Sequence, residues 1–185
     1  ATTKPLDVEV VALDWKWLFI YPNEGIATVN QLAIPVNTPV HFVITSDAVM
    51  NSFFIPRLGS MIYAMAGMQT QLHLMATEAG DYLGESANYS GRGFSDMQFR
   101  TLAMPQEQYQ AWVEKVRSSA DQLDDQTYPR LAAPSEAEPV KYYSHVEPNL
   151  FDEIVAKYNN GMVMDKSTGK MIHVQSAMSD MNMKE

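Results

Sequence analysis

The feature that most constrains the fold of this chain is a series of short apolar segments with a period of two residues. In residues 40–46 the apolar side chains of Val40, Phe42 and Ile44 occupy alternate positions, which is typical of a strand with one side against a core. Other predicted strands cover residues 8–21, 26–34, 49–55, 69–76, 81–87 and 97–104. Short strands at this spacing predict a mainly β fold, built as an antiparallel sandwich or barrel.

Turn-forming residues separate the predicted strands. Residues 22–25, Pro-Asn-Glu-Gly, form a tight reversal after the first long strand, and residues 35–39, which begin and end with Pro, stop the second. Residues 57–68 mix Gly and Met and predict a long loop.

After residue 104 the apolar period changes to that of a helix. Two segments follow the i, i+3, i+4, i+7 template, each beginning at a proline, Pro105 and Pro148. Their apolar positions are Tyr109, Trp112, Val113 and Val116 in the first, and Phe151, Ile154, Val155 and Tyr158 in the second. Asn159-Asn160-Gly161 ends the second helix.

The remaining C-terminal residues are less regular. Residues 120–139 are polar and acidic and predict a linker over the surface, residues 140–146 predict a short strand, and residues 161–185 have no periodicity. We therefore divide the chain into a β domain over residues 1–118, a linker with a helical extension over 119–161, and a Met-rich, mobile tail over 162–185.

Composition excludes several classes of function. The 185 residues carry a net charge of −9, and scattered basic residues do not form the clustered Lys and Arg surface that nucleic acids require. The chain has no cysteine, which excludes disulfides, thiolate metal ligands and thiol nucleophiles. We find no nucleophile–base pair, phosphate-binding glycine loop or spaced carboxylate pair, and so expect no catalytic or cofactor-binding residues.

Membrane insertion of this chain is also not expected. The longest strongly apolar run is Trp17–Tyr21, far shorter than a membrane-spanning helix. Residues 1–5 look like an arbitrary starting point, so we expect a soluble part of a membrane-anchored protein.

A loop over residues 84–97 has the spacing of a metal loop. Ser86, Ser90, Phe94 and Met97 follow one another at intervals of four, four and three, and Asn51 lies on an earlier predicted strand. This layout resembles subunit II of the haem-copper terminal oxidases. In the cytochrome c oxidase branch, a histidine and a Cys-x3-Cys-x3-His-x2-Met loop hold a dinuclear copper centre.

The resemblance implies that this chain has lost that centre. Asn51 stands for the first histidine, Ser86 and Ser90 for the cysteines, Asn88 for a carbonyl donor and Phe94 for the second histidine, while Met97 keeps the methionine. A mixed-valence copper pair needs bridging thiolates and imidazoles. Serine hydroxyls stay protonated at neutral pH, and Phe94 has no lone pair, so we predict no metal at these positions.

Three further segments resemble the ubiquinol oxidase branch, of the cytochrome bo type. They are residues 50–57, Met-Asn-Ser-Phe-Phe-Ile-Pro-Arg, residues 62–69, Ile-Tyr-Ala-Met-Ala-Gly-Met-Gln, and residues 89–91, Tyr-Ser-Gly. The likeness runs from about residue 8 to 118 and implies a Greek-key, cupredoxin-like sandwich or barrel with a C-terminal helical extension.

The same resemblance implies a location and partners. We expect a periplasmic domain at the bacterial inner membrane, in a proton-pumping complex that oxidises ubiquinol and reduces oxygen. Haems and copper are expected in subunit I, which this domain caps together with other membrane subunits. Cytochrome c is not expected as a partner, because quinol electrons pass directly to haem in that branch.

The aromatic, methionine and histidine residues of the β domain are explained by packing and surface roles, without a role in electron transfer or metal binding. Alternation places Trp15 and Trp17 on one strand face and Lys16 on the other, and packing explains these aromatics better than electron entry. Adaptable methionines suit a surface docked on a larger subunit, and those at this position are Met61, Met65, Met68 and Met75. The lone histidines His41, His73 and His145 indicate ordinary surface or hydrogen-bonded residues.

The tail leaves an alternative function open. It concentrates thioether and imidazole groups, the donors that Cu(I) prefers, although composition alone is weak support for a site. The candidates are Met162, Met164, Met171, His173, Met178, Met181 and Met183. With these ligands the chain could instead be a free-standing, cupredoxin-like copper carrier or electron-transfer protein.

Overall fold

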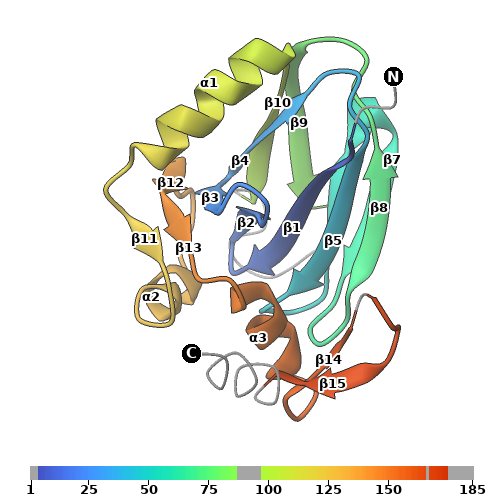
Figure 1. The fold of residues 1–185 in the computed structure, drawn as a ribbon, viewed down its shortest axis with the longest axis vertical. Coiled ribbons are helices and arrows are strands. Elements are labelled where there is room, and N and C mark those ends of the chain that lie inside the picture. The colour runs from blue at the N-terminus through green and yellow to red at the C-terminus, as the bar shows by residue number, and fades with distance from the viewer. Residues whose placement is uncertain (1–3, 87–96, 166, 175–185) are drawn as a thin grey trace.

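The computed structural model describes residues 4–86, 97–165 and 167–174 and contains two packed β-sheets with a C-terminal part against one of them (Figure 1). The six-stranded sheet has the order β12-β3-β2-β1-β5-β8, and the five-stranded sheet has the order β4-β10-β9-β6-β7. Most neighbours are antiparallel, but β1 pairs with β5, and β4 with β10, in parallel. The mainly β, two-sheet architecture that was predicted is confirmed.

The bounds of the elements are as follows. The six-stranded sheet consists of β1 (Leu6–Leu13), β2 (Lys16–Tyr21), β3 (Ile26–Val29), β5 (Val40–Ser46), β8 (Thr70–Leu74) and β12 (Lys141–Tyr143). The five-stranded sheet consists of β4 (Gln31–Pro35), β6 (Asn51–Ile55), β7 (Ser60–Ala64), β9 (Gly80–Ser86) and β10 (Gln98–Met104). The remaining elements are η1 (Pro56–Leu58), α1 (Gln106–Arg117), β11 (Gln122–Leu123), α2 (Tyr128–Ala132), β13 (His145–Val146), α3 (Leu150–Ala156), β14 (Met162–Met164) and β15 (Met171–His173).

An inner core fills the space between the two sheets and under α1. It includes Val8, Val10, Trp17, Phe19, Tyr21, Phe42, Phe53, Phe99, Trp112 and Val113. The rings of Phe53 and Phe99 stack at 5.3 Å between centroids, and Trp17 meets Phe53 edge-on at 5.6 Å. Aromatic pairs in these arrangements stabilise beyond the area that they bury, so this group holds the sheets together.

An outer core covers the opposite face of the six-stranded sheet. It joins Val11, Leu13, Leu18, Ile20 and Val29 of the sheet to Tyr128, Phe151, Ile154, Val155 and Val163 of the C-terminal part. Strands buried on both faces are apolar almost throughout rather than alternating. This explains why β2 is buried at every position.

Three predicted segments divide differently in the structure. Residues 8–21 form a hairpin of β1 and β2 with its turn at Asp14 and Trp15, not one long strand. Residues 26–34 form β3 and β4 in different sheets, because the chain crosses at Asn30, whose φ is +61°. The predicted loop over residues 57–68 contains the end of η1 and the strand β7.

The C-terminal part is also more regular than expected. The predicted linker contains β11 and α2, and the two strands β14 and β15 pair as a hairpin in the region where we expected a mobile tail. The first predicted helix is confirmed as α1, with all four apolar positions buried. The second is shorter than predicted, since α3 ends at Ala156 and Tyr158 lies beyond it.

Candidate functional site

The predicted copper position is built on two strands of the five-stranded sheet. Asn51 begins β6 and Met97 directly precedes β10, and both side chains are about 1% exposed. The Asn51 Nδ2 group donates a hydrogen bond to Met97 Sδ at 3.1 Å. The structure therefore brings together two positions that lie 46 residues apart in the sequence.

The remaining positions of the predicted loop are only partly described. Ser86 is the last residue of β9 and is buried, and Phe53 of β6 pairs with it across the sheet. Asn88, Ser90 and Phe94 lie outside the described residues. Ser86 thus lies opposite the middle of β6, two residues along that strand from Asn51.

The chemistry of these donors does not fit a dinuclear copper centre. A carboxamide nitrogen that donates its proton has no lone pair to give, and a single thioether is a weak ligand. Bridging thiolates are required, and the sequence has no cysteine. The Asn51 amide and the Met97 sulfur instead satisfy each other in a buried position. Beside them, the Trp17 indole N–H donates to the Met97 carbonyl oxygen at 3.4 Å.

Trp17 and Lys16 face opposite sides of β2, as alternation predicts. Trp17 is in the inner core, and Trp15 packs against that core from the turn. Lys16 is only 2% exposed and donates to Ala133 O at 2.7 Å and to Ser135 Oγ at 2.5 Å. Burial lowers the pKa of Lys16 from its ordinary value, and these bonds tie the C-terminal part to the β1–β2 turn.

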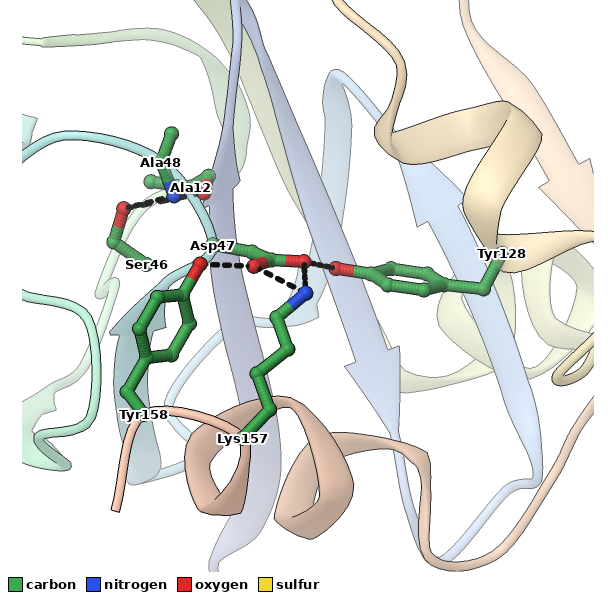
Figure 2. A network of polar contacts seen from close by, with 7 residues as sticks. All are labelled: Ala12, Ser46, Asp47, Ala48, Tyr128, Lys157 and Tyr158. Carbon is green, nitrogen blue, oxygen red and sulfur yellow. Dashed lines mark hydrogen bonds and ion pairs between the residues drawn. The ribbon is translucent and has the colours of Figure 1, made fainter. Parts of the chain in front are cut away.

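A second attachment of the C-terminal part centres on Asp47, just after β5 (Figure 2). Its side chain is 4% exposed and lies 2.7 Å from the Lys157 ammonium. Its two carboxylate oxygens accept hydrogen bonds from the hydroxyls of Tyr128, at 2.5 Å, and Tyr158. Burial and the Asp47 carboxylate raise the pKa values of both tyrosines. We name these four residues the Asp47 clamp.

The Asp47 clamp was not predicted from the sequence. Asp47 lies 81 residues from Tyr128 and 110 from Lys157, and no spacing rule relates residues so far apart. The local signal was limited to Tyr158, which we assigned to an apolar helix position. In the structure its hydroxyl reaches a carboxylate instead.

Two of the histidines treated as isolated are neighbours. His41 of β5 and His73 of β8 are opposite each other in the sheet, and their rings stack at 4.6 Å. His41 also contacts Asp7 Oδ1 at 3.2 Å and Gln71. His41 is a hydrogen-bonded histidine, as expected. Its contact with His73 was not predicted, because antiparallel pairing of β5 with β8 brings together residues that are distant in the sequence.

Exposed apolar side chains occur on β7 and in the segments that flank β6, β7 and β8. Met61 and Tyr63 alternate with the partly buried Ile62, so they share the outer face of β7. The other large exposed apolar residues in this part of the chain are Val49, Met50, Met68 and Met75. We name these six residues the methionine edge. It includes three of the four methionines predicted to suit a docked surface, while Met65 is half-buried.

Two further features concern residues 4–86, 97–165 and 167–174, which the structure describes. Within them, no group of three or more His, Cys, Asp or Glu residues is placed to hold a metal ion. Helices of the length and apolarity needed to cross a bilayer are not found in this part of the chain.

The two-sheet sandwich is cupredoxin-like, as its likeness to solved structures shows. It is similar to the periplasmic domain of subunit II of cytochrome oxidase from Bradyrhizobium japonicum, with a TM-score of 0.58 and 20% identity over 62% of this chain and 96% of that one. A subunit II of cytochrome c oxidase, in a mixed disulfide with a thioredoxin-like protein, gives a TM-score of 0.54 and 22% identity over 60% of this chain and 89% of the other.

Sequence comparison then identifies the family. Residues 22–104 match the family model of the cytochrome c oxidase subunit II periplasmic domain, and residues 117–162 match the COX aromatic-rich motif. The chain is 81% identical to ubiquinol oxidase subunit 2 of Acetobacter aceti, over 100% of this chain and 60% of that protein. It is 54% identical to cytochrome bo(3) ubiquinol oxidase subunit 2 of Pseudomonas putida, over 96% and 55%. The chain belongs to the subunit II family of the ubiquinol oxidases, and it spans little more than half the length of these relatives.

Proposed function

We propose that this chain is the periplasmic domain of subunit II of a proton-pumping ubiquinol oxidase, in which it has a structural role without its own copper centre. The observation that supports the proposal is the buried hydrogen bond between Asn51 and Met97, because these residues correspond, by the resemblance, to metal-ligand positions of the copper-bearing branch. The relatives that match this chain over nearly its full length are named as ubiquinol oxidase subunits.

This proposal assigns different roles to subunit I and to this domain. Ubiquinol is oxidised and oxygen is reduced at haems and copper in subunit I, and this domain caps that subunit on the periplasmic side of the bacterial inner membrane. The chain is a non-catalytic part of the enzyme and does not receive electrons from cytochrome c. In its full-length form the subunit is anchored in the membrane.

We assign contact with subunit I to the methionine edge. Large exposed apolar patches mark interaction sites, and methionine adapts its shape to a partner surface. The methionine edge includes two residues of β7, an outer strand of its sheet, and Met50, which directly precedes Asn51 of β6. We also propose that the chain consists of three parts. They are a cupredoxin-like domain over residues 1–118, an extension over residues 119–161 and a Met-rich region over residues 162–185.

Co-purification tests the proposal. Tagged full-length subunit II, extracted from membranes in detergent, should bring down haem-containing subunits and ubiquinol-dependent oxygen consumption that added cytochrome c does not stimulate. A double substitution of Met61→Glu and Tyr63→Glu should reduce haem recovery at least tenfold. Val140→Glu, an exposed position on the extension, is the matched control. Recovery of subunit II without haem from wild-type membranes would refute the proposal.

A further inference from the structure

The hairpin of β14 and β15 aligns four soft metal donors. The strands are antiparallel, with Met162 opposite His173, Val163 opposite Ile172, and Met164 opposite Met171. Residues two apart on a strand point to the same face, and directly opposite residues share that face. Met162, Met164, Met171 and His173 therefore lie on one face, and Val163 and Ile172 on the other.

Packing shows which face is turned outward. Val163 is buried in the outer core, and Ile172 packs against that core. The donor face is consequently turned away from the protein, with Met171 52% exposed, His173 exposed, and Met162 and Met164 half-buried. Side chains directly opposite each other in such a ladder have Cβ atoms about 4.5–5.5 Å apart, which places all four within reach of one small ion.

The hairpin is held in shape before any ion binds. At its base, Gly161 adopts a φ of +83° and donates to Ala156 O at 2.9 Å, while its own carbonyl accepts from Val174 N at 2.9 Å. At its tip, Asp165 N donates to Lys170 O at 2.8 Å, and the Asp165 carboxylate accepts from Ser167 N at 2.8 Å. A site on such a frame loses little conformational freedom on binding.

We infer that this face is a binding site for monovalent copper, with the thioethers of Met162, Met164 and Met171 and the imidazole of His173 as ligands. Thioethers and imidazole are soft, uncharged donors that suit Cu(I). The set contains no carboxylate, so the site does not favour Ca²⁺ or Mg²⁺, which require oxygen ligands. It holds an ion at the surface, is separate from the Asn51–Met97 position, and does not depend on the proposed role in a quinol oxidase.

Competition for Cu(I) tests the site in the full 185-residue chain. Under anaerobic conditions the protein should remove one equivalent of Cu(I) from the complex of Cu(I) with bicinchoninate. A Met164→Leu/Met171→Leu variant, close in volume to the original, should bind at least tenfold more weakly. Met61→Leu/Met75→Leu, at exposed methionines on the methionine edge, should bind as the wild type does.

A third variant separates the hairpin from the residues that follow it. Met178, Met181 and Met183 lie outside the described residues, and their replacement by Leu should leave the affinity unchanged. Loss of binding in this variant, or retention of binding in Met164→Leu/Met171→Leu, would overturn the inference.

A spectroscopic readout does not depend on the variants folding normally. With ¹³C-methyl methionine and Ag⁺ as a redox-inert substitute for Cu(I), the methyl signals of Met162, Met164 and Met171 should shift together and saturate at one equivalent. The signals of Met61 and Met75 should not move. Equal shifts at all exposed methionines, or none in the hairpin, would contradict the assigned site.

Discussion

At the scale of single residues, buried polar side chains whose partners are distant in the sequence contribute much of the specificity of the fold. Asp47 is the main example, because one nearly inaccessible carboxylate accepts bonds from two tyrosines and pairs with a lysine (Figure 2). Removing one member of a buried polar group leaves the others unsatisfied, which costs more than the net contribution of the bonds themselves.

We expect Asp47→Ala to lower the free energy of unfolding by about 3 kcal/mol, measured by urea denaturation. The matched control is Asp81→Ala, which also removes a carboxylate paired with a cation. Both Asp81 and its partner Arg100 are largely exposed, so that change should cost about 0–1 kcal/mol. Equal losses in the two variants would show that the clamp has no special role.

The contact between Gly84 and Phe99 gives a second prediction at this scale. A Cβ atom at Gly84 would stand 2.1 Å from the Phe99 ring, which stacks on Phe53 in the inner core. Gly84→Ala should therefore destabilise the protein by about 2 kcal/mol or more, because the ring has to move. Gly80→Ala on the same strand, where the nearest ring atom is at 3.5 Å, should stay within about 0.5 kcal/mol in the same denaturation assay.

At the scale of elements, the crossing from β3 to β4 decides how the two sheets are joined. Asn30, at the crossing, has a backbone conformation in the left-handed region. Its side chain accepts a hydrogen bond from Trp17 N at 2.8 Å and donates one to Glu138 O at 3.1 Å. Asparagine tolerates this conformation better than most residues. Its side chain also joins β2, the crossing and the extension.

Substitutions at Asn30 should separate conformation from hydrogen bonding. Asn30→Gly keeps access to positive φ and loses both bonds, whereas Asn30→Ala loses the bonds and adds strain. We expect losses of about 1–2 kcal/mol for Gly and about 1 kcal/mol more for Ala in thermal or urea unfolding. If alanine were tolerated as well as glycine, the backbone conformation would not be a determinant of the crossing.

At the scale of the whole molecule, the C-terminal part completes the fold. The outer face of the six-stranded sheet carries apolar side chains that pack against residues of the C-terminal part, including Leu123, Ile154 and Val174. A chain that ends at residue 118 would expose this face. We expect it to aggregate or to show no cooperative unfolding by circular dichroism, while a chain that ends at residue 174 unfolds as the full chain does. A soluble, cooperatively folded 1–118 monomer would contradict this prediction.

Buried tyrosines in both cores predict a loss of stability at high pH. Burial raises the pKa values of Tyr21, Tyr109 and Tyr128 above the ordinary value of 10.0. Above about pH 10 the unfolded chain loses these protons and the folded chain keeps them, so the free energy of unfolding falls as pH rises. Each tyrosine contributes a slope of up to about 1.4 kcal/mol per pH unit.

Denaturation with urea at about pH 8 and about pH 11, on either side of the ordinary tyrosine pKa, measures this loss. Tyr128→Phe should be less stable than the wild type at the lower pH, where it lacks the bond to Asp47, and should show a shallower decline toward the higher pH. An unchanged pH dependence in this variant would mean that Tyr128 ionises equally in both states.

The sequence by itself determined the features that depend on near neighbours. Alternating residues identified strands such as β5, the i, i+3, i+4, i+7 pattern identified α1, and the resemblance to the copper loop of the oxidase family grouped Asn51 with Met97. Each of these rests on the geometry of a few consecutive residues or on a family motif.

Only the tertiary structure decided how distant segments combine. The split of residues 8–21 into a hairpin, the Asp47 clamp and the outer core all depend on contacts that local patterns do not record, and Asp47 and Lys157 are 110 positions apart. Composition identified methionines and one histidine near the C-terminus as possible copper ligands. The pairing register of β14 and β15 placed four of these residues on one face of the hairpin. The physical reason is that side-chain periodicity records which positions are buried, whereas the partner that buries them is chosen by the packing of the whole chain.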